Sequence, residues 1–316
     1  MKGAVTGMSK IQCEHIIKVL NEHGIKYERS ASMANYSTFR SGGHAALLVL
    51  PQSLSQLTVV LEACGALPSE NILVIGKGSN LLFCEDEWNG VVICTVGINS
   101  VTCEGNFVFA DCGASISKIC ACAERNALSG LEFAYGIPGS CGGAVFMNAG
   151  AYGGQISDVL SFSEYYDIKS HKTVRLTGIE NDFSYRHSFY AYNPDCVVIR
   201  AGFELCDGNS EEIHMKMSEY MARRKEKQPL DMPSAGSVFK RPPNAFAGAL
   251  IEQCGLKGTR IGDAEVSTKH AGFIVNCGNA SFGDICSLIE RVKAEVLEKT
   301  GVALECEVRL IRNGSV

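Results

Sequence analysis

Hydrophobic and polar residues alternate along the chain with the two spacings that are typical of helices and of strands. The first helical stretch places Ile16, Ile17 and Leu20 on one face and ends at Gly24. Helices are predicted over residues 9–24, 54–65, 115–126, 209–226, 247–254 and 282–299. Strands are predicted over residues 72–75, 91–112 (with a turn at 104–106), 161–168, 172–177, 196–205, 272–276 and 303–311.

The order of these elements indicates the fold class. Helices and strands are interleaved, but they do not repeat as regular strand–helix–strand units. This order favours an α+β fold over a doubly wound parallel sheet. The composition becomes strongly charged in the helix that begins near residue 208, so we place a domain boundary there.

Charge and hydropathy exclude two classes of partner. The 316 residues carry a formal net charge of -5, whereas a protein that binds a nucleic-acid backbone needs an excess of basic residues. No apolar run approaches the roughly 20 residues that span a bilayer. We therefore expect neither nucleic-acid binding nor membrane insertion.

The cysteines indicate a reducing compartment. The chain has 15 of them, and the closest pair is Cys120 and Cys122, so neither a CxxC pair nor a cysteine–histidine cluster with zinc spacing occurs. No metal site is predicted. The first residues lack the apolar core of a secretion signal, which argues against disulfides. We expect reduced thiols, mostly buried as small apolar side chains, in a cytoplasmic protein.

Two glycine-rich segments interrupt the regular pattern. Gly76-Lys-Gly-Ser-Asn80 follows the strand at 72–75, and residues 136–154 contain seven glycines and one proline. We interpret residues 136–154 as a loop without a regular helix or strand. Both loops fit the diphosphate of a dinucleotide, because glycine lets backbone N–H groups approach an anion, although tight turns alone also explain them. Neither loop is a Walker or a Rossmann fingerprint.

Two further segments carry candidate site residues. Arg186 lies in the sequence Tyr-Arg-His-Ser, where its guanidinium suits a carboxylate or phosphate or is simply a surface charge. Ser237 lies in a turn-like segment, residues 234–243, that also contains glycine, lysine, arginine and proline. The motif Gly-x-Ser-x-Gly is absent around Ser237, which disfavours a hydrolase nucleophile.

The predicted last strand carries a third group of charges. Alternation places Glu305, Glu307 and Arg309 on one face of this strand. These side chains are either part of a site or solvated surface charges.

Taken in this order, the segments resemble the UDP-N-acetylenolpyruvoylglucosamine reductases, enzymes of peptidoglycan precursor synthesis. The resemblance covers residues 37–311. The matching blocks are STFRSGG (37–43), VIGKGSNLL (74–82), GLEFAYGIPGSCGGAVFMNAGAYGG (130–154), FSYRHS (183–188), PSAGSVFKRPP (233–243), AGALIEQCGLKGTRIGDAEVSTKHAGFIVN (247–276) and LECEVRLI (304–311).

The resemblance implies a vanillyl-alcohol oxidase-like (PCMH-type) FAD-binding fold of two α/β subdomains, followed by a C-terminal α+β substrate-binding domain. The implied domains are a helix and lead-in strand at 1–41, the FAD-binding domain at 42–207, split near 96, and the substrate-binding domain at 208–316. From His187 the chain runs directly into a predicted strand. It is therefore similar to the shorter subtype, which lacks a tyrosine-bearing lid loop.

Site residues follow from the resemblance position by position. It implies Ser237 as the proton donor and Arg186 and Glu307 as the partners that stabilise the intermediate. The implied substrate ligands are Tyr185, Lys227, Arg241 and His270; the last two stand where the longer subtype has asparagine and glutamine. The implied FAD ligands are Gly76, Gly78, Ser79, Asn80, Gly136, Ile137, Pro138, Gly139, Gly142, Gly143, Asn148, Gly150 and Arg309.

The resemblance also implies non-covalent FAD, with NADPH as the electron donor for reducing UDP-N-acetylglucosamine enolpyruvate to UDP-N-acetylmuramate. A fixed guanidinium such as Arg186 would meet the negative charge that develops on the substrate. Glu307, if kept neutral, would hydrogen-bond the substrate carboxylate. We expect a monomer with these two nucleotides as its partners.

Two alternatives remain open. A flavin oxidase of the same fold would act on an alcohol or a sugar, and such enzymes often hold flavin covalently through histidine or cysteine. A nucleotide-binding module that has lost catalysis would keep the glycine loops. The joint presence of Arg186, Ser237 and Glu307 argues against the second alternative.

Overall fold

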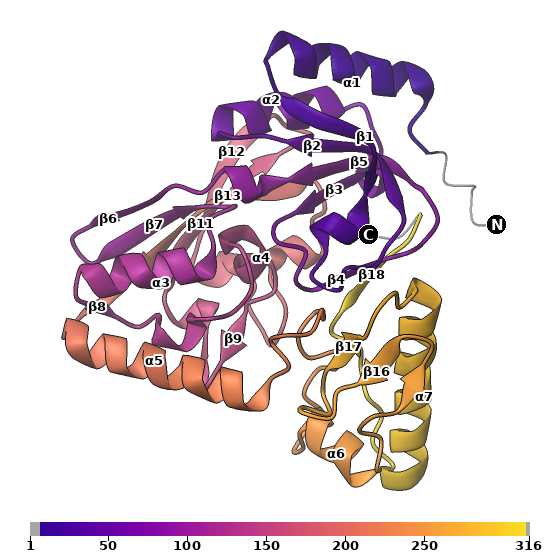
Figure 1. Ribbon diagram of the computed structural model, residues 1–316. Helices are drawn as coiled ribbons and strands as arrows, with labels where there is room; N and C mark the ends of the chain where they lie inside the picture. The colour runs from indigo at the N-terminus through magenta and orange to yellow at the C-terminus, as the bar shows by residue number, and fades with distance from the viewer. Residues whose placement is uncertain (1–6, 314–316) are drawn as a thin grey trace. The chain divides into compact units, whose positions relative to one another are not determined.

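The computed structural model describes residues 7–313 and divides into two compact units (Figure 1). Unit 1 contains the residues up to 29, together with 47–77 and 89–222. Unit 2 contains residues 30–46 and 78–88 and the chain from residue 223 onward. Two short N-terminal segments therefore belong with the C-terminal part of the chain. The predicted domain boundaries after residues 41 and 207 are drawn differently from this division and stay a prediction.

The first sheet has four strands in the order β1-β2-β5-β3. They are β1 (Lys26–Ser32), β2 (His44–Leu50), β5 (Trp88–Cys94) and β3 (Ile72–Ile75), and β3 and β5 pair in parallel. Helices α1 (Lys10–Glu22) and α2 (Leu54–Cys64) pack on each other. A serine before each helix accepts a hydrogen bond from a backbone N–H of the first turn, which fixes where the helix begins.

A second sheet in unit 1 has five antiparallel strands in the order β12-β11-β13-β7-β6. The strands are β6 (Val101–Glu104), β7 (Phe107–Asp111), β11 (Leu160–Asp167), β12 (Lys172–Thr177) and β13 (Cys196–Glu204). Helix α3 (Ile116–Arg125) packs on β6 and β7, and α4 (Cys141–Phe146) packs on β13 and β7 (Figure 1). Val108, Ala201 and Phe203 are fully buried in the core between these layers.

Short elements complete unit 1. The short strands are β8 (Leu128–Ser129), β9 (Gly150–Ala151), β10 (Gly154–Gln155) and β14 (Cys206–Asp207). The 3-10 helices within residues 7–313, of which η1 lies in unit 2, are η1 (Met33–Tyr36), η2 (Ser69–Asn71), η3 (Thr95–Gly97), η4 (Glu132–Ala134), η5 (Ile156–Asp158), η6 (Gly178–Asn181) and η7 (Phe189–Ala191). Helix α5 (Ser210–Lys227) begins in unit 1, where it buries Ile213 and Met217, and ends in unit 2.

Unit 2 has a separate core. A three-stranded antiparallel sheet of β15 (Arg260–Ile261), β16 (Ala264–Val266) and β17 (Ile274–Asn276) packs with α6 (Ala247–Gln253) and α7 (Phe282–Thr300). Figure 1 shows α7 lying along this sheet. Strands β4 (Leu81–Phe83) and β18 (Arg309–Ile311) form a parallel pair. Helix α7 ends at Gly301, whose φ of 73° is the left-handed conformation that glycine adopts without strain.

Most predicted elements are confirmed within one or two residues, and the mixed α+β content is confirmed. Three predictions are wrong. The strand predicted from residue 91 ends at Cys94, and the 3-10 helix η3 follows it before β6 begins at Val101. Residues 136–154 are not devoid of regular structure, because the Ser140 side chain accepts the Gly143 N–H and starts α4 despite the glycines. The last strand covers only 309–311. Residues 305–307 pair with 238–240 instead, and a bend at Val308 lies between the two pairings, so strand alternation does not extend from Glu307 to Arg309.

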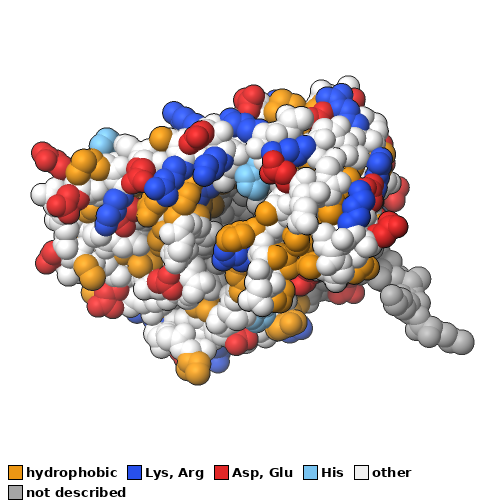
Figure 2. Space-filling view, turned by 90° about the horizontal axis from the view of Figure 1, so that it is seen from below, with side chains coloured by type: hydrophobic (Ala, Val, Ile, Leu, Met, Phe, Trp, Pro, Cys, Tyr) orange, Lys and Arg blue, Asp and Glu red, His pale blue; other side chains and the backbone are white. Residues whose placement is uncertain are grey.

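Helix hydropathy and surface charge can be described for residues 7–313. Within residues 7–313 no helix is both long enough and apolar enough to cross a bilayer. On the face in Figure 2, lysine and arginine side chains are mixed with aspartate and glutamate, and no broad patch of one sign is visible among the described side chains.

No disulfide joins the 15 cysteines, all of which lie in the described part of the chain. Burial raises the pKa of the Cys64 and Cys112 thiols to about 12, and it raises the pKa of Cys141 as well. A buried thiol with a raised pKa is nearly all protonated at neutral pH, so it is a poor nucleophile.

The folded chain should therefore react with Ellman's reagent in well-separated phases. We expect the exposed Cys206 to react first, and Cys64, Cys112 and Cys141 to react only after unfolding in denaturant. Cys206→Ser should remove the fastest phase, whereas Cys64→Ser should leave it unchanged. Rapid modification of Cys112 in the native chain would contradict the burial described here.

Candidate functional site

Three segments of unit 2 run side by side around Ser237. The N–H of Val238 donates to the Gly272 carbonyl at 2.9 Å, and the Val238 carbonyl accepts the N–H of Glu307 at 2.7 Å. Ser237 itself forms an isolated bridge with Phe273. Because both edges of this short segment are paired, the Ser237 backbone is fixed while the residue stays exposed. Ser237 and Glu307, far apart in sequence, thus become close neighbours.

Asn80 and Arg309 join the same cluster. The Asn80 amide donates to the Glu307 carbonyl at 3.2 Å, and the Asn80 carbonyl accepts the Arg309 N–H at 3.0 Å. The parallel pairing of β4 with β18 begins directly after these contacts. Burial lowers the pKa of Arg309, and a guanidinium taken out of water is stabilised by an anionic partner.

His270 is linked to Ser237 through Gly272. The Gly272 N–H donates to His270 Nδ1 at 3.1 Å, and the His270 ring lies edge-on to Phe273 with ring centroids 4.9 Å apart. Burial lowers the pKa of His270. Since Nδ1 accepts a hydrogen bond, the proton of the neutral ring sits on Nε2. His270 therefore presents a neutral N–H donor, as the glutamine of the longer subtype would.

The other two predicted substrate ligands of unit 2 are exposed. Lys227 is the last residue of α5. The Arg241 guanidinium carbon lies 4.0 Å from the ring centroid of Phe246, which is a cation–π contact. Such a contact restrains the arginine side chain.

In unit 1 the turn that carries Arg186 is attached to the second glycine loop through Asn148. The Asn148 amide donates to the Ser184 carbonyl at 3.1 Å and its Oδ1 accepts the Ser157 N–H at 2.9 Å. The residue is 1% exposed. Asn148 is therefore a structural link, and its predicted contact with FAD stays a prediction.

Arg186 sits at the tip of this turn. Ser184 and His187 exchange two backbone hydrogen bonds of 3.2 Å, and Arg186 has a left-handed φ of 57°. Its Nη2 donates to the Gly150 carbonyl at 3.3 Å, and its guanidinium carbon lies 5.0 Å from the Tyr185 ring centroid. The guanidinium is thus held against the glycine loop.

The two glycine loops contact each other within unit 1. A Cβ on Gly76 would lie 1.9 Å from Ser140 Oγ, so this glycine is required by packing against the residue that starts α4. Ser140 was missed by the sequence analysis, although a serine three residues before the helical N–H that it accepts is the usual signal of a cap.

Gly139, in the second loop, is not required by packing. A Cβ on Gly139 would find its nearest neighbours at 3.8 and 3.9 Å, and Gly139 does not adopt a left-handed φ. Neither sterics nor backbone conformation explains glycine at this position. Space that a side chain would fill is what a closely approaching dinucleotide needs, so the loop fits FAD.

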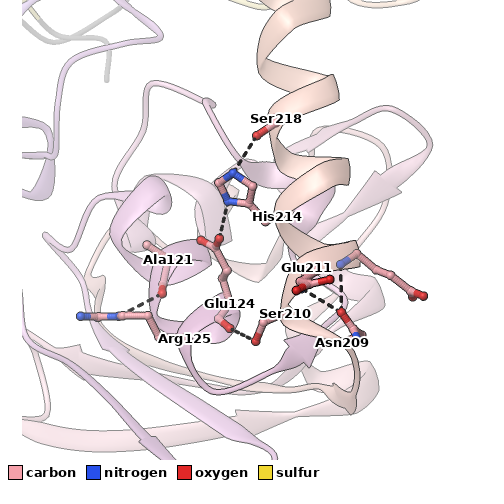
Figure 3. A network of polar contacts seen from close by, with 9 residues as sticks. Ala121, Glu124, Arg125, Asn209, Ser210, Glu211, His214 and Ser218 are labelled. Carbon is pink, nitrogen blue, oxygen red and sulfur yellow. Dashed lines mark hydrogen bonds and ion pairs between the residues drawn. The ribbon is translucent and has the colours of Figure 1, made fainter.

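A second polar network contains a carboxylate, a histidine and a serine in the order found in serine hydrolases, but it has no site that could bind an oxyanion. Figure 3 shows His214 between Glu124 at 2.7 Å and Ser218 at 3.4 Å, with Ser210 also donating to the Glu124 carbonyl. The His214 side chain is 68% exposed. Ser218 lies in the middle of α5, where backbone N–H groups are used by the helix and cannot bind an oxyanion. The network braces α5 against α3.

The predicted residues thus fall into two groups. Unit 2 brings together Ser237, Glu307, Asn80, Arg309 and His270. Unit 1 holds Arg186 and the second glycine loop. That Arg186 acts at the same centre as Ser237 and Glu307 stays a prediction.

Asn148→Ala should destabilise the chain, because it removes two hydrogen bonds that the buried Asn148 side chain makes to backbone groups and leaves alanine at a φ of 42°. We expect a loss of about 1–3 kcal/mol in the free energy of unfolding, measured by urea denaturation. Asn148→Gly relieves the backbone strain but not the lost bonds, so it should recover only part of the loss. Parent-like stability of Asn148→Ala would show that these bonds do not stabilise the turn.

The lowered pKa of His270 predicts a pH dependence of stability. An unfolded histidine gains its proton near pH 6.5, whereas folding opposes protonation of His270. The contribution of His270 is therefore complete above about pH 6.5, and the free energy of unfolding decreases below it by at most about 1.4 kcal/mol per pH unit. In denaturation between pH 7.5 and 5, His270→Gln should remove this component. The exposed control His44→Gln should keep it.

Comparison with known proteins agrees with this geometry. Residues 45–175 match the family described as FAD binding domain, and residues 228–311 match the C-terminal domain of UDP-N-acetylenolpyruvoylglucosamine reductase. The UDP-N-acetylenolpyruvoylglucosamine reductase of Clostridium novyi is 46% identical over 93% of this chain and 94% of its own length. The reductase of Caldicellulosiruptor bescii is 45% identical over 92% of this chain and 93% of its own length.

A solved structure gives the same result. The crystal structure of the UDP-N-acetylenolpyruvylglucosamine reductase from Thermus caldophilus has a TM-score of 0.78 and 33% identity, covering 91% of this chain and 100% of that chain. The predicted FAD-binding, PCMH-like fold with α+β content is confirmed, and the oxidase alternative is disfavoured. The chain belongs to the family of UDP-N-acetylenolpyruvoylglucosamine reductases, FAD-binding oxidoreductases of peptidoglycan precursor synthesis.

Proposed function

We propose that this reductase converts UDP-N-acetylglucosamine enolpyruvate to UDP-N-acetylmuramate, with non-covalent FAD as cofactor and NADPH as electron donor. FAD, when bound, accepts hydride from NADPH and supplies hydride to the methylene carbon of the enolpyruvyl group. The observation that carries the proposal is the backbone pairing of Val238, the residue after Ser237, with Glu307 in a chain 46% identical to a reductase of this name. We further propose that the enzyme is cytoplasmic and monomeric.

Ser237 is the proton donor in this proposal. Addition of hydride to the methylene carbon moves the π electrons onto the neighbouring carbon, which then needs a proton. A serine hydroxyl is a weak acid, but a carbanion-like carbon is very basic, and proton transfer depends on position. The pairing of Val238 on both sides fixes that position, and solvent returns the proton to the exposed serine.

Arg186 and Glu307 stabilise the charge that appears before the proton arrives. The negative charge spreads into the substrate carboxylate, where a permanently charged guanidinium lowers its energy without reorganisation. Arg186 is restrained by the Gly150 carbonyl and the Tyr185 ring, so little entropy is lost when it binds the anion. Glu307, when neutral, donates a hydrogen bond to the same carboxylate.

The remaining predicted ligands suit the nucleotide part of the substrate. Lys227 and Arg241 offer exposed cationic donors for the diphosphate. His270 offers a neutral N–H, and Tyr185, 48% exposed, offers a hydroxyl and an aromatic surface. The FAD ligands proposed in the two glycine loops and at Arg309 supply backbone N–H groups and one guanidinium.

The test is an anaerobic flavin absorbance measurement near 450 nm, with NADPH added first and the enolpyruvyl nucleotide second. In the parent, absorbance should fall with NADPH and recover with the nucleotide. Ser237→Ala should keep the fall, because NADPH oxidation needs no proton from Ser237. Recovery should slow by about 10²–10⁴-fold, the usual contribution of general acid catalysis.

Two comparisons make this result decisive. Ser234→Ala removes a hydroxyl from the same segment, and it should leave both half-reactions intact. If Ser237→Ala slowed both half-reactions equally, Ser237 would be structural and not the acid. Flavin that stays with the protein after acid precipitation would instead support the oxidase alternative.

A further inference from the structure

The last turn of α5, which carries Lys227, has one backbone carbonyl that its own helix cannot satisfy. In a continuous α-helix the Lys225 carbonyl would accept the N–H of the residue four positions later. That residue is Pro229, which has no N–H. The carbonyl one residue earlier, that of Arg224, still accepts the Gln228 N–H at 2.8 Å. The proline therefore ends the helical hydrogen bonding at Lys225.

A lysine from another segment of unit 2 supplies the missing donor. The Lys269 ammonium donates to the Lys225 carbonyl at 2.6 Å, although the two residues are 44 positions apart in the sequence. A cation at the carboxyl-terminal end of a helix also interacts favourably with the helix dipole. Lys269 thus replaces the N–H that Pro229 lacks, and it ties the end of α5 to its own segment.

The segment that carries Lys269 is itself fixed. Ser267 is buried, and its Oγ accepts the N–H of Lys269 at 3.2 Å and the N–H of His270 at 3.3 Å. The Ser267 N–H donates to the Phe273 carbonyl, and the Phe273 N–H donates to the His270 carbonyl, both at 2.9 Å. Residues 267–273 therefore form a hydrogen-bonded turn that holds the backbone of Lys269 and His270 in place.

The hydrogen bond from Lys269 joins two residues that the proposed function assigns to the substrate. Lys227 lies two positions after the Lys225 carbonyl, and His270 directly follows Lys269. The last turn of a helix frays where its carbonyls have no partner, and an exposed lysine on a frayed turn must be ordered when it binds a ligand. That ordering costs conformational entropy and weakens binding. A tether at the Lys225 carbonyl removes part of this cost beforehand.

We propose that Lys269 is a positioning residue for the substrate, whose hydrogen bond to the Lys225 carbonyl holds Lys227 where it binds the diphosphate of the nucleotide. The inference rests on the proposed function, which makes Lys227 a substrate ligand. It assigns to Lys269 a role that is exerted through Lys227 and not through a contact of its own with the substrate. It also gives a reason for a lysine at position 269, because Pro229 leaves a carbonyl there to be satisfied.

The test is steady-state NADPH oxidation by the FAD-loaded, full-length chain, at saturating NADPH and varied concentrations of the enolpyruvyl nucleotide. Lys269→Met removes the donor and keeps the approximate length of the side chain. We expect it to raise KM for the nucleotide about three- to tenfold, the usual effect of one lost hydrogen bond. The kcat should stay within about twofold of the parent, because a bond that orders a binding residue stabilises the bound ground state and the transition state alike.

A double-mutant cycle separates positioning from direct binding. Lys227→Ala should raise KM by itself, and adding Lys269→Met to it should change KM by less than about twofold, since the residue that Lys269 positions is then absent. Lys269→Arg keeps a cationic donor, so its KM should lie closer to the parent than that of Lys269→Met. The matched control Lys293→Met removes a lysine of α7 that pairs with Glu290, and it should leave KM unchanged.

Several outcomes would overturn the inference. An unchanged KM in Lys269→Met, with Lys227→Ala impaired, would overturn it and leave the proposed function standing. KM increases that multiply in the double variant would make Lys269 an independent ligand, and a loss confined to kcat would make its role structural. An unchanged KM in Lys227→Ala would remove Lys227 from the diphosphate site, and this inference with it. A parent that oxidises no NADPH with this nucleotide would instead overturn the proposed function itself.

Discussion

The backbone pairing on both sides of Val238 is the constraint on which the rest of the catalytic cluster depends. It joins the segment after Ser237 to Gly272 on one side and to Glu307 on the other. A serine hydroxyl has little intrinsic acidity, so its value as a proton donor comes from being held in one place. Neither neighbour is part of a long strand, and the pairing is therefore local. This local pairing fixes the Ser237 backbone while the residue stays exposed.

Glycine serves two different purposes in this chain. At Gly76 and Gly78 the missing side chain allows another part of the same unit to approach, Ser140 in one case and the Tyr36 carbonyl in the other. At Gly139 no such approach occurs, and the missing side chain leaves space instead. A glycine-rich sequence therefore combines positions that organise the protein with positions that admit a ligand.

Burial leaves two basic residues of this cluster, His270 and Arg309, in different charge states. It lowers the pKa of both His270 and Arg309. Histidine titrates near neutral pH, so the shift makes His270 neutral, whereas the ordinary pKa of arginine is so high that Arg309 stays charged. One desolvated cluster thus contains a neutral donor and a permanent cation. A neutral donor and a permanent cation make different contacts with a nucleotide, and this cluster supplies one of each.

The sequence by itself determined the elements with strong periodicity and, through long specific blocks such as residues 130–154, the family and the site residues expected from it. It could not show that Ser140 starts a helix inside a glycine-rich segment, because the cap acts there together with the burial of Cys141, Ala144 and Val145 against other parts of the fold. It could not show that Asn148 is consumed by structural bonds or that Lys269 replaces the donor that Pro229 lacks. Such facts depend on which groups meet after folding, and residues as distant as Asn80 and Glu307 meet only in the tertiary structure.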